Sequence, residues 1–160
     1  MCDYSLHAIP NRLSVEGEQL VTHRFPTFSI GLASPADLEK AVSAHRESQK
    51  EERSWWMRFK IWFSQAPVRS EEVPAVCIPP GARLLLRDIP EETRQEFAVG
   101  PVEEVTFTEL TPNAYRYRDG VRFDNGREVL LQHLREGLSV DVLSLALAEP
   151  DYEPLREQEV

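Results

Sequence analysis

Residues 105–131 read VTFTELTPNAYRYRDGVRFDNGREVLL, and this stretch decides the fold. Val105 and Phe107 alternate with threonines, which is the pattern of a half-buried β-strand. The dipeptides Asp119-Gly120 and Asn125-Gly126 are both signatures of a tight type I′ hairpin turn. Two such turns, with short β-forming runs between and after them, predict a β-meander.

Further extended runs lie on both sides of this meander. Ser139 to Leu147 supplies a last strand, and short strands are expected at Val73 to Ile78 and at Ala82 to Leu86. Leu20 to Leu32 reads as one strand and a second extended piece, interrupted by Pro26. The sequence therefore predicts an α+β fold whose mostly antiparallel sheet, a meander or partial barrel, lies in the C-terminal half.

A helical segment, residues 35–65, is expected after the N-terminal extended region. It starts at Ser34-Pro35-Ala36-Asp37, where the serine can cap, the proline suits the first helical position and the aspartate favours the positive end of the dipole. Residues 43–54 contain no large apolar side chain, so this part has nothing to bury. We expect it to protrude, either as a helix in solvent or as a mobile linker. A shorter helical turn is expected at Pro90 to Phe97.

Length and composition predict a single domain over residues 1–148, because 160 residues with 41% hydrophobic content can bury a real core. Residues 149–160 are acidic and proline-bearing and are expected to form a disordered tail. The net charge of −9 disfavours nucleic-acid binding. With no signal sequence, no apolar run long enough to span a bilayer and two cysteines, the chain is expected in the cytoplasm.

The opening run Cys2-Asp3-Tyr4-Ser5-Leu6-His7, together with Pro74-Ala75-Val76-Cys77 and Pro80-Gly81, resembles a group of short bacterial proteins for which no activity is known. The resemblance covers roughly the first 35 residues and the β-rich half from Val73. It implies an independent bacterial domain and carries over no catalytic residue.

Cys2 is one candidate for chemistry. Removal of Met1 would expose a cysteine whose own α-amine could act as its base, as in N-terminal nucleophile hydrolases; the structural alternative is a small residue packed near the N-terminus. Cys2 and Cys77 could also meet, with His7 completing a metal site. No paired ligand spacing supports that site, and Cys77 in an apolar strand is typical of a buried hydrophobic residue. The sequence therefore predicts neither a metal nor a cofactor.

Two other polar features each have a structural explanation as well as a functional one. His23 alternates in step with Val21 and Phe25, so we expect it on the core side of its strand, where a hydrogen-bonded histidine is more common than a catalytic one. Several strand arginines could form an anion pocket, although strand arginines usually occupy a solvated face. A small enzyme or ligand-binding protein that uses Cys2, His7 and Cys77, with Arg12, is the alternative functional hypothesis.

The most unusual feature is a cluster of aromatic residues that contains every tryptophan of the chain. On a helix, Trp55, Phe59, Trp62 and Phe63 form one apolar stripe, and Trp56 lies beside it. No acidic residue occurs between Arg53 and Arg69. Such a basic, Trp-rich helix is typical of one that binds a membrane interface or a groove in a partner.

The main hypothesis is a non-enzymatic interaction module whose helix over residues 54–64 contacts a protein partner, a second copy of the chain or, peripherally, a membrane surface. The structural alternative is that the helix docks on the sheet and its tryptophans belong to the core.

Overall fold

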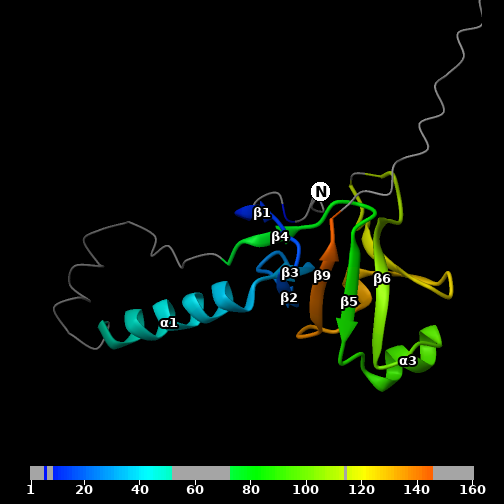
Figure 1. The fold of residues 1–160 in the computed structure, drawn as a ribbon. Helices are drawn as coiled ribbons and strands as arrows, with labels where there is room; N and C mark the ends of the chain where they lie inside the picture. The colour runs from blue at the N-terminus through cyan, green and yellow to red at the C-terminus, as the bar shows by residue number, and fades with distance from the viewer. Residues whose placement is uncertain (1–5, 7–8, 52–72, 114, 146–160) are drawn as a thin grey trace, which may run out of the picture.

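The computed structural model describes residues 6, 9–51, 73–113 and 115–145. Within them the fold is α+β, as the sequence predicts. Seven strands form an antiparallel sheet in the order β3-β2-β9-β5-β6-β7-β8, which curls into a half-barrel, and β1 and β4 form a small parallel sheet (Figure 1). The elements are β1 (Asn11–Leu13), β2 (Gln19–Arg24), β3 (Ile30–Ala33), α1 (Pro35–Glu51), β4 (Ala75–Cys77), β5 (Arg83–Arg87), α3 (Glu91–Phe97), β6 (Val102–Glu109), β7 (Asp119–Phe123), β8 (Glu128–Leu130), the 3-10 helix η2 (Leu131–His133) and β9 (Ser139–Ser144).

The predicted meander is confirmed, because β5, β6, β7 and β8 pair antiparallel in chain order. Its last hairpin turns at Asn125-Gly126, where the Phe123 N–H donates to the Arg127 carbonyl at 2.9 Å. Gly126 has a φ of 82°, a left-handed conformation that glycine adopts without steric cost. A hairpin turn therefore lies where the sequence predicts one, but it is not type I′, because that type needs a positive φ at both central residues and Asn125 has none.

The other predicted hairpin turn, at Asp119-Gly120, is wrong. Both residues are buried inside β7, and Gly120 pairs with Thr108 on β6 and Leu130 on β8. A Cβ atom on Gly120 would lie 2.6 Å from the carbonyl oxygen of Val129. The glycine is therefore required by the close approach of two strands, not by a turn.

The predicted phase of β2 is also wrong. Leu20 and Thr22 are almost fully buried, whereas the side chain of His23 remains 25% exposed and packs edge-to-face on Phe25. Alternation alone allows either phase, and a threonine can face the interior only if its hydroxyl is hydrogen-bonded. Thr22 meets that condition, since its Oγ1 donates to the Arg135 carbonyl at 2.6 Å.

Two hydrophobic clusters hold these elements together. The larger one fills the half-barrel, with Phe107, Val121 and Val140 among its fully buried side chains. The smaller one lies between the β1–β4 sheet and the β2–β3 hairpin and includes Phe25 and Cys77. Sequence reasoning did not predict β1, which is a strand of three residues.

One side chain bridges the two edges of the seven-stranded sheet. Gln132 follows the edge strand β8, and its amide accepts from the Ile30 N–H at 2.9 Å and donates to the Ile30 carbonyl at 2.8 Å. Ile30 begins the opposite edge strand, β3, and is 2% exposed. Gln132 thus supplies the hydrogen bonds that a neighbouring strand would otherwise give.

Candidate functional site

Most residues predicted to carry function lie outside the described part of the chain. They are the candidate nucleophile Cys2 and the candidate metal ligand His7. The aromatic set also lies outside it: Trp55, Trp56, Phe59, Trp62 and Phe63. What the structure does describe is the helix that leads into the aromatic segment, the root of that helix, and a separate cleft at one end of the half-barrel.

Cys77 lies in β4, as predicted, and is 6% exposed. It is not the free thiol that the sequence suggested, because it is bonded in a disulfide. A cysteine in a disulfide offers no thiolate for nucleophilic attack or metal binding. Disulfides persist chiefly in oxidising compartments, so this bond disfavours the predicted cytoplasmic location. That location stays a prediction.

Helix α1 leads away from the sheet, so its distal end stands clear of the other labelled elements (Figure 1). Leu38, in its first turns, packs against the smaller hydrophobic cluster. Val42, about one turn further on, is already 52% exposed. Beyond it the described helix contains no large apolar residue up to Glu51. A helix with no apolar face beyond its root is one that extends into solvent.

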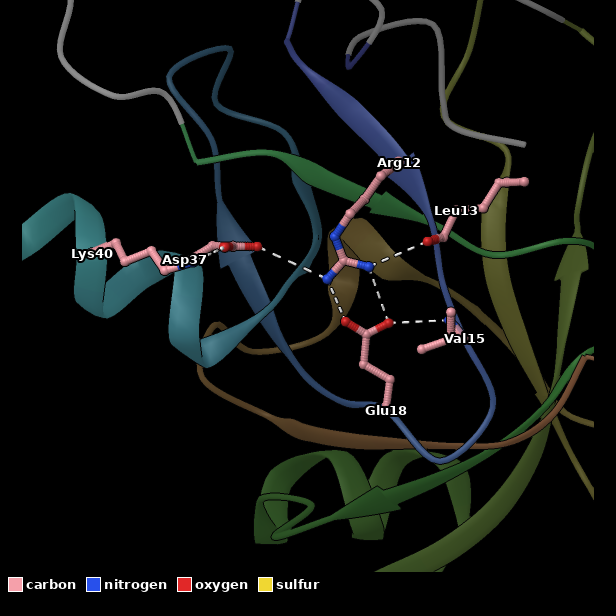
Figure 2. Close-up of polar contacts among 6 residues, drawn as sticks. All are labelled: Arg12, Leu13, Val15, Glu18, Asp37 and Lys40. Carbon is pink, nitrogen blue, oxygen red and sulfur yellow. Dashed lines mark hydrogen bonds and ion pairs between the residues drawn. The ribbon is translucent and has the colours of Figure 1, made fainter.

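The root of α1 is fixed to β1 and to the turn before β2 by Arg12 (Figure 2). The guanidinium of Arg12 forms a fork to both carboxylate oxygens of Glu18, and its Nη1 donates to the Leu13 carbonyl at 3.2 Å. Nη2 also lies 3.9 Å from Oδ2 of Asp37, which is in the first turn of α1. One arginine therefore connects three separate segments of the chain.

The Arg12–Glu18 pair is electrostatically tight. The hydrogen bond from Arg12 holds the pKa of Glu18 below its usual range, although burial acts in the opposite direction, and the Val15 N–H donates to the same carboxylate at 3.1 Å. The hydrogen bond to Glu18 in turn raises the pKa of Arg12. Both groups stay charged at neutral pH, so a bidentate ion pair joins β1 to the turn before β2, and the root of α1 is attached to this pair through Asp37.

A cleft of about 320 Å³ opens at another place, between the β5–α3 loop and the η2–β9 loop. It is lined by six residues: Asp88, Pro90, Arg135, Glu136, Gly137 and Leu138. Small-molecule sites usually occupy roughly 300–1,000 Å³, so the cleft is at the lower end of that range. None of these six residues was predicted as a site residue, because about fifty positions separate the two loops.

Strand β2 holds the η2–β9 wall of the cleft in place. The Thr22 hydroxyl donates to the Arg135 carbonyl at 2.6 Å and accepts from the Leu138 N–H at 2.8 Å. The Gly137 N–H also donates to the Thr22 carbonyl at 2.8 Å. Because Thr22 is 1% exposed, its hydroxyl is shielded from water, and these bonds fix the loop backbone.

The next residues of β2 hold the carboxylate of Glu136. The backbone N–H of Arg24 donates to its Oε1 at 3.0 Å, and Nδ1 of His23 lies 3.3 Å from the same oxygen. The Arg24 Nε lies 4.0 Å from Oε2. His23 therefore braces an acidic residue at the cleft instead of filling the core, and Glu136 has a cationic partner.

Among the described residues, no group of three or more His, Cys, Asp or Glu side chains could hold a metal ion. No helix in the described ranges is long and apolar enough to cross a membrane. No protein-family model, curated protein or solved structure matches the chain.

Proposed function

We propose that this protein is a non-enzymatic interaction module that contacts a protein partner, including a second copy of the chain, through the Trp-rich segment at residues 54–64. The observation that carries the proposal is the course of α1, which leaves the domain after a short packed root. The antiparallel sheet is then the scaffold, and Arg12, which is paired with Glu18, also contacts Asp37 at the root of α1.

Covalent geometry supports this role for the segment. At about 1.5 Å per residue, the 17 residues of α1 extend about 26 Å. Trp55 follows Glu51 by four residues, and four residues span at most about 14 Å. A segment joined to the outer end of α1 by so short a stretch of chain suits contact with another molecule better than packing on the sheet.

Tryptophan fluorescence tests the proposal directly, because the three tryptophans of the chain are Trp55, Trp56 and Trp62. Their emission therefore reports on this segment alone. We expect red-shifted emission, accessible to an aqueous quencher, from the dilute full-length protein. Blue-shifted emission that the quencher cannot reach in the dilute monomer would mean that the tryptophans are core residues, and the proposal would be withdrawn.

A pair of variants separates association from folding. Trp55→Ser with Trp62→Ser should leave the urea midpoint unchanged while abolishing concentration-dependent association in analytical ultracentrifugation. If these tryptophans were buried in the core, each substitution would instead lower the free energy of unfolding by about 3–5 kcal/mol. The matched control is Phe28→Ser with Tyr115→Ser, which removes two aromatics that are 79% and 84% exposed on the body of the domain. The control variant should associate like the wild type.

An anionic membrane surface is the other partner to which a basic, Trp-rich helix could bind. Anionic and neutral vesicles distinguish the two cases with the same fluorescence signal. If emission becomes protected only with anionic vesicles, and not with rising protein concentration, then membrane contact replaces the protein partner.

A further inference from the structure

Two charged side chains face the cleft between the β5–α3 and η2–β9 loops without a partner. Asp88 lines one wall and Arg135 lines the other. Within the described part of the chain, neither side chain makes a hydrogen bond or an ion pair. The third charge of the cleft, Glu136, is paired with the guanidinium of Arg24, and Nδ1 of His23 lies 3.3 Å from the same carboxylate. The uncompensated charges are therefore one anion and one cation, on opposite walls.

The walls that carry these charges are built on fixed backbone. The Arg135 carbonyl is held by the buried Thr22 hydroxyl. Asp88 has a φ of 60°, a left-handed conformation that non-glycine residues rarely adopt, and it is followed by Ile89, which is 4% exposed and donates to the Pro101 carbonyl at 3.1 Å. A strained backbone persists only where the surrounding structure determines it. Both charged residues thus project from loops with little freedom to rearrange.

We propose that this cleft binds a small zwitterion of the amino-acid class, with its ammonium group at Asp88 and its carboxylate at Arg135. A ligand with a single charge would leave one wall uncompensated, whereas a zwitterion satisfies both. The volume of about 320 Å³ accommodates a free amino acid. This inference is independent of the role proposed for the Trp-rich segment.

The test is a titration of the full-length protein, followed by amide chemical shifts, with glycine, L-alanine and L-leucine as probes. We expect shifts at Ile89, Gly137 and Leu138. Acetate and methylammonium, which each carry one of the two charges, should bind at least about tenfold more weakly than glycine, since a hydrogen bond to a charged group contributes roughly that factor.

Asp88→Asn and Arg135→Gln should each weaken glycine binding about tenfold. Both residues are exposed, so these changes should leave the fold intact. The matched controls are Asp124→Asn and Arg116→Gln, exposed charges that do not line the cleft, and they should bind like the wild type. Acetate binding as tight as glycine, or glycine binding that survives Asp88→Asn, would replace the zwitterion site with a simple anion site. The absence of any shift at tens of millimolar amino acid would overturn the proposal altogether.

Discussion

The Thr22→Val substitution is the sharpest test of how the cleft wall is built. Valine has nearly the same shape as threonine, so no cavity forms, but the hydroxyl that joins Arg135 to Leu138 is lost. The Leu138 N–H, on a residue that is 3% exposed, would keep its burial without an acceptor. An unsatisfied buried donor costs about 1–3 kcal/mol. Arg135 is an exposed residue whose carbonyl water can reach, so the loss of its hydrogen bond adds only about 1 kcal/mol.

The expected total is about 2–4 kcal/mol out of a typical 5–15 kcal/mol of domain stability. Urea unfolding at equilibrium measures it, with the disulfide kept intact. Thr22→Ser is the matched control, because it keeps the hydroxyl and loses one methyl group, at a cost near 1 kcal/mol. Hydrogen exchange should also become faster at the Leu138 amide in Thr22→Val. If Thr22→Val and Thr22→Ser unfold at the same urea concentration, the hydroxyl does not hold the loop and the reasoning fails.

Three further outcomes follow from the contacts. Gly120→Ala should destabilise the domain by more than about 3 kcal/mol, because the added Cβ meets a backbone carbonyl of β8 at 2.6 Å; a loss below 1 kcal/mol in urea unfolding would contradict that close approach. Gln132→Ala should cost about 2 kcal/mol by leaving both backbone groups of Ile30 unpaired at the sheet edge, and amide exchange at that residue should rise with it. The pKa of Glu18 is lowered by its hydrogen bond from Arg12, so its contribution to stability is present above the ordinary pKa of 4.5 and is lost as the pH falls through the lower value in the folded state. Glu18→Gln should therefore be less stable than the wild type at pH 7, and urea midpoints should converge below pH 4.5; a gap that stays constant with pH would exclude this assignment.

The fold class and several elements could be predicted because local interactions specify them. The alternation around Val105 and Phe107 is a property of one strand, the Asn125-Gly126 turn depends on a single left-handed glycine, and the helix start at Pro35 needs only its neighbours. Each of these features is confirmed. The prediction that the segment after Pro35 protrudes also rests on local composition, and the described part of α1 does extend from the sheet.

The errors and omissions all concern contacts between distant segments. Asp119-Gly120 has the composition of a turn, and only the neighbouring strand shows why a glycine is needed in the middle of β7. The phase of β2 depends on whether the Thr22 hydroxyl finds a partner, and that partner is 113 residues away.

The sequence by itself therefore determined the α+β class, the meander and the position of the Trp-rich segment after a polar helix. The tertiary structure alone decided which face of β2 is buried, which residues fix the root of α1, and where the cleft lies. Local patterns record the preferences of neighbouring residues. Asp88 and Arg135 are brought to one cleft by strand pairing between segments about fifty positions apart, and no local pattern encodes that pairing.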